Sequence, residues 1–200
     1  MENKNRCSWA NHQNDALYQK YHDCEWGVPI YDDNKIFEYL TLESAQAGLS
    51  WLTILRKREN YREAFANFNV EKVAKFDQRK VDELMKNSGI VRYRPKIEAA
   101  INNAQKFIEV QKEFGSFSKY MWNFVNNKQI KNSRKNLSEI PSQVEISKIF
   151  HKDLKKRGFN FLGPVTCYAH MQASGMVNDH FVDCFRHSEI NALAGVEKKY

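Results

Sequence analysis

Four side chains of the kind that bind metals stand near the two ends of the chain. Cys7 and His22 lie at one end, and His180 and Cys184 lie at the other. His180 and Cys184 are close enough in sequence to share one face of a helical turn. Two thiolates and two imidazoles suit tetrahedral zinc. A zinc ion held by all four would tie the chain ends together and remove loop entropy from the unfolded chain.

The spacing of these residues is not specific to metal binding. One short His–Cys pair with two distant partners arises often by chance, and spacing alone favours buried polar residues with a satisfied core histidine. Cys24 and His187 are also close enough in sequence to be alternative ligands. The pattern by itself therefore leaves the zinc site open.

A second candidate site is the carboxylate of Glu43, which follows a segment that carries Trp9, Tyr21 and Trp26. A carboxylate within an aromatic cage suits a flat cationic ligand, because the rings stack on it and the negative charge attracts it. The alternative is a solvated glutamate on a helix, with the tryptophans in the core. Spacing alone favours that alternative.

The third candidate is a glycine-flanked turn at 158–163, which feeds a helix that opens with Pro164. Free backbone N–H groups and the positive end of a helix dipole can hold a phosphate there. Lys155, Lys156 and Arg157 precede the turn and would add charge-assisted contacts. An ordinary turn beside a solvated basic run explains the pattern equally well.

Helices are predicted for most of the chain between these candidate sites. Gly48 supplies a helix stop and Ser50 an N-cap, so Leu49 is expected on a tight turn between two helices. The polar stretch 127–141 is predicted to be an exposed connection, and strand signals are weak throughout. Apolar periodicity and helix-start residues predict helices over 34–47, from Trp51 onward, over 71–87, 95–113, 117–126 and 143–156, and from Pro164 to about residue 174.

Composition is that of a basic globular protein. The 200 residues include 42% hydrophobic and 28% charged residues but only 8 Gly and 4 Pro, which favours helices joined by short turns. The formal charge of +7 suits a polyanionic partner such as nucleic acid. No apolar run is long enough to cross a membrane, and the N-terminus lacks a signal-peptide pattern. We therefore expect a cytoplasmic protein, in which disulfides are disfavoured.

Several long motifs, in order, resemble the 3-methyladenine DNA glycosylase I family. The resemblance covers about residues 5–185. It is carried by residues 21–29 (YHDCEWGVP), 42–43 (LE), 46–51 (QAGLSW), 57–61 (KRENY), 89–92 (GIVR) with Arg94 and Lys96, 137–141 (LSEIP), 155–159 (KKRGF) and 178–180 (NDH).

The resemblance implies an all-α, helix-hairpin-helix fold with the hairpin at Gly158–Gly163. We expect residues 1–200 to form a single glycosylase unit of two interleaved helical subdomains, with the active site between them. The family's structural zinc site, carried over, falls on Cys7, His22, His180 and Cys184. The family's base pocket falls on Glu43 as the catalytic residue, with Tyr21, Trp51, Trp9 and Trp26 around the base.

The implied reaction is excision of N3-methylated adenine from alkylated duplex DNA, with free 3-methyladenine as product. Because the target base lies inside the duplex, it must be flipped out. Leu49, with Gly48 beside it, is expected to fill the gap as an apolar wedge. The hairpin, including Gly158 and Gly163, is expected to hold phosphates together with Lys156 and Arg157. We expect the protein to act as a monomer.

Three features depart from the family pattern. The family usually has no cysteine at the position of Cys24, and residues 185–200 follow no pattern. Many helix-hairpin-helix glycosylases also carry a catalytic aspartate after the hairpin helix, but Asp179 is not assigned that role here, because this family lacks such a residue in its usual role.

Two other functions would account for part of the sequence pattern. A zinc-dependent nucleobase deaminase needs His-x-Glu and Pro-Cys-x-x-Cys. This chain has His22-Asp23-Cys24-Glu25 and no Cys-x-x-Cys, so a deaminase is disfavoured. A non-enzymatic helix-hairpin-helix DNA-binding module explains the charge and the hairpin, but it does not explain a carboxylate among aromatic rings.

Overall fold

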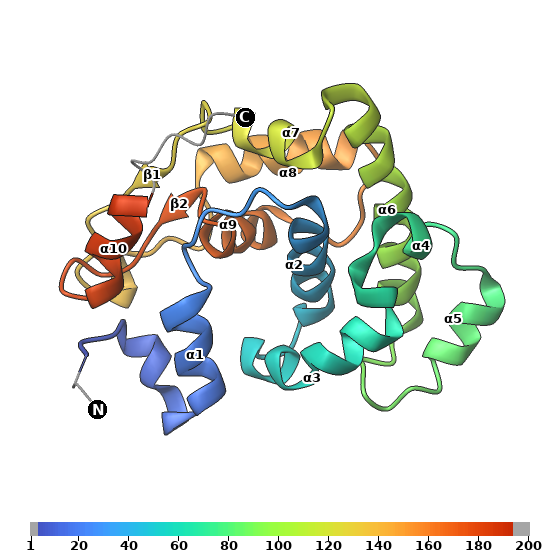
Figure 1. Cartoon of the computed structure of the whole chain (residues 1–200), viewed down its shortest axis with the longest axis horizontal. Helices are drawn as coiled ribbons and strands as arrows, with labels where there is room; N and C mark the ends of the chain where they lie inside the picture. The colour runs from blue at the N-terminus through green and yellow to red at the C-terminus, as the bar shows by residue number, and fades with distance from the viewer. Residues whose placement is uncertain (1–3, 194–200) are drawn as a thin grey trace.

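Helices account for most of residues 4–193, the part of the chain that the computed structural model describes (Figure 1). Within that range, ten α-helices are joined by short connections. They are α1 (Ala16–Cys24), α2 (Asp33–Gln46), α3 (Trp51–Ala64), α4 (Val70–Val73), α5 (Gln78–Leu84), α6 (Arg94–Phe114), α7 (Phe117–Asn123), α8 (Glu145–Lys156), α9 (Pro164–Ala173) and α10 (Phe185–Leu193). Three 3₁₀ segments supplement them: η1 (Ser8–Asn14), η2 (Ala66–Phe68) and η3 (Leu137–Glu139).

Side-chain caps set where several of these helices begin. The Ser50 hydroxyl accepts a hydrogen bond from the Thr53 amide at 3.1 Å, which confirms the predicted start of α3. Asp32 caps α2 and Ser116 caps α7 in the same way. Each cap satisfies an amide that has no partner inside its helix. The predicted helices over 34–47, 95–113, 117–126 and 143–156 are therefore found with small shifts at their ends.

The centre of the molecule is formed by α2 and α9, which pack against each other (Figure 1). Every residue of α2 from Ile36 to Ala45 is buried, including the ionisable Glu38 and Glu43. α9 also packs on α8, and α2 packs on α6. A helix enclosed on all sides must pair its buried polar groups with its neighbours. α2 is therefore the element that carries Glu43 into the interior.

The predicted helix over 71–87 is wrong. The segment forms two short helices, α4 and α5, because Asp77 adopts an extended backbone and caps a new helix. Its carboxylate accepts a hydrogen bond from the Lys80 amide at 3.0 Å. An internal N-cap of this kind ends one helix and begins another without any glycine or proline.

The exposed connection predicted at 127–141 is more ordered than expected. Its β1 strand (Ile130–Lys131) pairs in parallel with β2 (Val177–Asn178), and η3 follows it. Strands of two residues are too short for alternation to reveal them. In the tail, where no pattern was found, residues 185–193 form α10; residues 194–200 lie outside the described range.

No helix within residues 4–193 is long and apolar enough to cross a membrane.

Replacing Gly175 by alanine is expected to destabilise the fold strongly. Gly175 has φ +73°, and a Cβ there would lie 2.4 Å from the backbone of Val28 and Pro29. The left-handed conformation and the clash together should lower the free energy of unfolding by about 3 kcal/mol. For a chain of this size, that corresponds to a fall in Tm of about 10 °C.

The matched control is Gly163→Ala, because Gly163 has φ −70° and nothing lies within 4 Å of its added Cβ. Thermal unfolding of both variants checks the prediction. Equal melting temperatures for the two variants would contradict it.

Candidate active site

A pocket of about 280 Å³ opens between α1, α2, α3 and α9. Its volume is close to the lower end of the range found for small-ligand sites. Glu43 and the four aromatic residues predicted to surround the base all line it. The aromatic lining is Trp9, Tyr18, Tyr21, Trp26 and Trp51, the polar lining is Glu43, Gln46 and Gln172, and Leu137, Ile140, Ala169 and Ala173 complete the wall.

Glu43 is the one acidic group in the lining of this pocket. Its side chain is 3% exposed, and burial raises its pKa above the ordinary value. The Oε2 atom lies 2.9 Å from Nδ1 of His170 on α9, which partly offsets that rise. The Oε1 atom is buried and has no hydrogen-bond partner. The pocket therefore holds a carboxylate oxygen that is free to accept a hydrogen bond from a ligand.

The aromatic side chains form two groups around Glu43. The rings of Tyr21 and Trp51 lie 5.5 Å apart at 56°, and those of Trp9 and Trp26 lie 4.9 Å apart at 75°. The two ring planes are not parallel in either pair, so a flat ligand that stacks on one ring would meet the other ring of that pair at an angle. Burial, followed by the nearby Tyr39 and Glu43, raises the pKa of Tyr21, which stays a neutral phenol.

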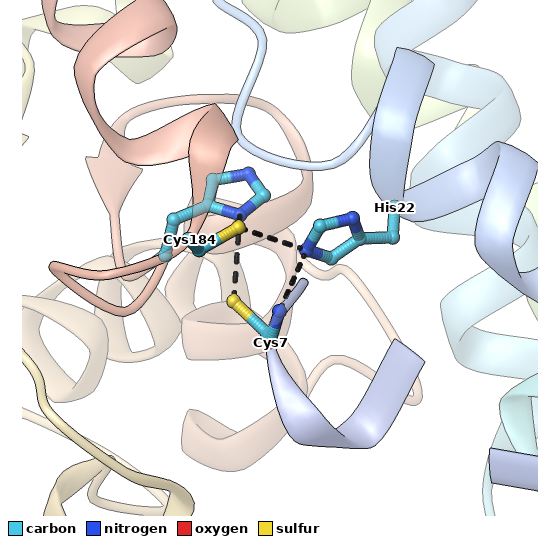
Figure 2. Close-up of side chains that lie close together, drawn as sticks. Cys7, His22 and Cys184 are labelled. Carbon is cyan, nitrogen blue, oxygen red and sulfur yellow. Dashed lines mark hydrogen bonds between the residues drawn. The ribbon is translucent and has the colours of Figure 1, made fainter. Parts of the chain in front are cut away.

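The four predicted metal ligands come together in one buried cluster (Figure 2). In Figure 2 the sulfur atoms of Cys7 and Cys184 and the ring of His22 point toward one another. All four ligand atoms lie within 4.8 Å of one another. Cys184 Sγ is 3.5 Å from His22 Nε2 and 3.7 Å from His180 Nδ1, and Cys7 Sγ is 3.6 Å from His180 Nδ1.

These separations suit a tetrahedral metal ion. With zinc–sulfur bonds of about 2.3 Å and zinc–nitrogen bonds of about 2.0 Å, sulfur and nitrogen ligands lie about 3.6 Å apart. The outer ring nitrogens are also held, as is usual for metal-binding histidines. His22 Nδ1 lies 2.8 Å from a carboxylate oxygen of Asp23, and His180 Nε2 lies 2.9 Å from the carbonyl oxygen of Trp26.

The two alternative ligands lie elsewhere. Cys24 is exposed at the end of α1, and His187 Nε2 lies 2.9 Å from the carbonyl oxygen of Asn132. Neither belongs to the cluster. The structure thus distinguishes the four clustered residues from Cys24 and His187, whereas sequence spacing left the choice of ligands open.

The cysteine–histidine cluster and the pocket share a wall. The ring of Trp9 packs edge-on against His22 at 5.1 Å, and the ring of Trp26 packs edge-on against His180 at 4.7 Å. Both tryptophans line the pocket. The positions of the cluster histidines therefore help to set the shape of the ligand site.

Leu49 stands on the tight turn that was predicted, three residues after Gln46 in the pocket wall. Its side chain is 42% exposed. Gly48 provides the turn with φ +82°, and the Leu49 amide donates to the Gln46 carbonyl. Lys96 Nζ donates to the carbonyls of Ala45 and Ala47, which holds the end of α2 in place. An exposed leucine on a braced turn can act as an apolar wedge.

The glycine-flanked turn connects α8 to α9 and is anchored from α6. Asn103 accepts a hydrogen bond from the Asn160 amide and donates one to the Asn160 carbonyl, at 2.8 and 2.9 Å. Asn102 donates to the carbonyl of Gly158. Within residues 4–193, the amides at 161–163 have no hydrogen-bond partner in the protein. They lie directly before the start of α9, where a helix dipole favours an anion.

The basic residues before this turn differ in their surroundings. Lys156 is exposed. Arg157 forms ion pairs with Glu113 and Asp153, both at 2.6 Å, and its guanidinium stacks over the rings of Phe114 and Tyr120. The paired carboxylates raise the pKa of Arg157 further. The contact of Arg157 with DNA stays a prediction. Its ion pair with Glu113 connects the end of α8 to α6.

Asp179 is fully engaged by its own chain. It is buried, and it accepts hydrogen bonds from Asn132, the Tyr168 hydroxyl and the Gln172 amide at 2.5–2.7 Å. Because Gln172 lines the pocket, Asp179 orients a pocket residue without entering the pocket itself. Asp179 therefore holds Gln172 in the pocket wall and does not itself line the pocket.

Sequence reasoning missed four polar or aromatic residues of the site: Tyr18, Gln46, His170 and Gln172. Tyr18 and Gln46 stand one turn away from Tyr21 and Glu43, so helical spacing could have found them. His170 offered no local signal, because its partner Glu43 lies 127 residues away along the chain.

The fold and the pocket define a mostly helical protein that can hold a flat ring against a buried carboxylate, beside a cysteine–histidine cluster. A family model described as methyladenine glycosylase matches residues 9–187. A DNA-3-methyladenine glycosylase of Haemophilus influenzae is 48% identical over 179 residues, which cover 90% of this chain and 96% of the relative.

Two solved structures of 3-methyladenine DNA glycosylase I are similar over most of their length. One, from Staphylococcus aureus, has a TM-score of 0.87 at 39% identity and covers 98% of this chain and 99% of its own. The other, a tyrosine-to-phenylalanine variant in complex with 3-methyladenine, also has a TM-score of 0.87, at 41% identity, with 90% and 96% covered. The chain belongs to the methyladenine glycosylase family.

Proposed function

We propose that this protein hydrolyses the N-glycosidic bond of N3-methylated adenine in alkylated duplex DNA and releases free 3-methyladenine. The observation that carries the proposal is the buried and unpartnered Oε1 of Glu43, a residue that lines a pocket walled by aromatic rings. Methylation at N3 makes the adenine of a nucleotide cationic. An ionised carboxylate and electron-rich rings favour that cation over a neutral base.

The chemistry asks little of a general acid, because the cationic base is already a good leaving group. As the bond between the base and the sugar breaks, its electron pair moves onto the base and neutralises the positive charge. The sugar develops oxocarbenium character, water adds to the sugar carbon, and a proton is lost to solvent. Glu43 accepts hydrogen bonds from the base edge, and the aromatic walls, including Trp51 and Tyr21, exclude water from it.

For DNA binding, we propose a helix-hairpin-helix formed by α8, the turn at 158–163 and α9. The unpartnered amides at 161–163 and exposed Lys156 would hold phosphates without reading the sequence. The formal charge of +7 adds a general attraction to DNA.

A base-release assay tests the proposed function directly. The protein is incubated with methylated duplex DNA, and the products are separated by chromatography. Release of free 3-methyladenine supports the proposal. Binding to the DNA without release of any base would favour the alternative, a non-enzymatic DNA-binding module.

Replacing Leu49 by alanine is expected to lower excision from duplex DNA about tenfold. The wedge offsets part of the few kcal/mol needed to flip a nucleotide, and loss of an inserted leucine removes about 1.5 kcal/mol or more. Excision from single-stranded methylated DNA should change little, because no stacked duplex has to be opened.

Leu193→Ala at the end of α10 is a control of similar exposure. Rates on duplex and single-stranded substrates are compared for both variants. An equal loss on both substrates for Leu49→Ala would mean that Leu49 does not act in flipping.

We also propose that Cys7, His22, His180 and Cys184 hold a structural Zn²⁺ ion. The three sulfur–nitrogen separations of 3.5–3.7 Å and the held outer nitrogens of both histidines support this assignment. All four ligands come from the protein, which leaves no open position for a substrate or water. The zinc would therefore stabilise the fold and take no part in the reaction.

A further inference from the structure

The buried carboxylate of Glu43 depends on one basic side chain. His170 Nδ1 lies 2.9 Å from Oε2, and the His170 side chain is fully buried. Within residues 4–193, Glu43 forms no ion pair with arginine or lysine. The other oxygen, Oε1, has no partner. One half of the carboxylate is thus held from within the protein, and the other half is left for a ligand.

The surroundings of His170 direct its hydrogen bond toward Glu43. Its other ring nitrogen, Nε2, lies 3.3 Å from the sulfur of Met121 on α7, which is a weak acceptor. The ring of Phe150 on α8 packs near it at 6.4 Å. Both neighbours are uncharged. Within residues 4–193, the only strong acceptor near either ring nitrogen is therefore Glu43, which favours a proton on Nδ1.

The titratable groups around Glu43 add no positive charge. Tyr21 on α1 and Cys167 on α9 both interact with the Glu43 charge, and burial raises the pKa of each. Both groups therefore stay neutral near pH 7. Burial favours the protonated form of Glu43, and the contact with His170 opposes it. Without the His170 donor, more of the carboxyl would be neutral and a poorer acceptor for a cation.

We propose that His170 is a positioning residue, which holds Glu43 ionised and rotated so that Oε1 faces the bound base. This inference rests on the proposed role of Glu43 in binding the cationic base. In this arrangement Nδ1 of His170 donates the hydrogen bond to Oε2 of Glu43, and Oε1 is left for the bound base.

Two variants of His170 separate the hydrogen bond from the packing. His170→Asn retains a donor at the position of Nδ1, and His170→Leu fills space without any donor. The probe is 3,9-dimethyladeninium, a cationic mimic of the methylated nucleotide, with binding measured by calorimetry. The leucine variant should bind it about tenfold more weakly than the wild type, and the asparagine variant within about twofold.

The pH profile of base excision gives a second readout, which a purely structural role would not move. In His170→Leu the acidic limb should move to higher pH, because Glu43 becomes easier to protonate. In His170→Asn that limb should stay near its wild-type position. Met121→Leu, which changes only the neighbour of Nε2, should leave both readouts unchanged.

Several outcomes would overturn the inference. Wild-type affinity and an unmoved acidic limb in a folded His170→Leu would show that Glu43 needs no donor. Equal losses in the asparagine and leucine variants would show that the imidazole shape matters and the Nδ1 donor does not. A wild type that releases no base would instead refute the proposed function, so the two failures are distinguishable.

Discussion

Glu43→Gln is expected to reduce excision of 3-methyladenine from methylated duplex DNA by about 10- to 100-fold. The substitution preserves the size of the side chain but removes the negative charge that faces the base. A hydrogen bond to a charged group contributes about 1.5–3 kcal/mol, which corresponds to that loss. The measurement is the single-turnover rate of base release, together with the affinity for the cationic base mimic.

The same substitution should not lower the stability of the protein. Burial raises the pKa of Glu43 in the folded state, so its ionised form is more costly there than in the unfolded chain. The wild type should therefore lose stability as the pH rises from below the ordinary carboxyl pKa through the raised pKa of Glu43. The glutamine variant lacks this loss, and near pH 7 its Tm should equal or exceed that of the wild type.

Glu83→Gln is a suitable control, because Glu83 lies on α5, is 69% exposed and, among the described residues, forms an ion pair only with Lys80. Activity should be unchanged in this control. An active Glu43→Gln variant with wild-type affinity would exclude Glu43 from the base pocket. A strong loss of Tm would show instead that Glu43 stabilises the fold.

The sequence predicted those elements whose signals are local. Ser50, Gly48 and the apolar face of α6 mark helix ends and a buried stripe within a few residues, and the structure confirms them. The break at Asp77 was missed because helical periodicity runs through it, while one side-chain cap decides the boundary. β1 and β2 were missed because their pairing joins residues far apart along the chain.

The candidate site shows the same division. Glu43 and its aromatic neighbours were found through motifs of the family, and the structure places them around one pocket. His170 was not found, since nothing in its own segment indicates a partner on α2. The cysteine–histidine cluster could be predicted only in part. Its residue types suggested zinc, but spacing did not show which residues come together. Only the folded chain brings Cys7 beside His180 and leaves Cys24 outside.

Cys184→Ser is expected to release zinc and to lower the Tm by about 10–15 °C. The cluster joins residues that are far apart along the chain, such as Cys7 and His180, which are 173 positions apart. By analogy with a disulfide that closes a loop of this length, losing the link costs about 4–5 kcal/mol. Metal analysis of the wild type should find about one zinc per chain, and thermal unfolding measures the loss of stability.

The loss of zinc should also weaken binding in the pocket. Trp9 and Trp26 pack against the rings of His22 and His180, which the proposed zinc ion would fix in place. Once they are released, the aromatic walls lose their support, so affinity for the cationic base mimic should fall even at temperatures where the variant is folded. Cys24→Ser is the matched control, because this exposed thiol lies next to the cluster in sequence but outside it. A wild type without zinc, or equal effects of the two substitutions, would show that the cluster does not bind the metal. Unchanged affinity for the base mimic in a folded, zinc-free variant would show that Trp9 and Trp26 keep their positions without zinc.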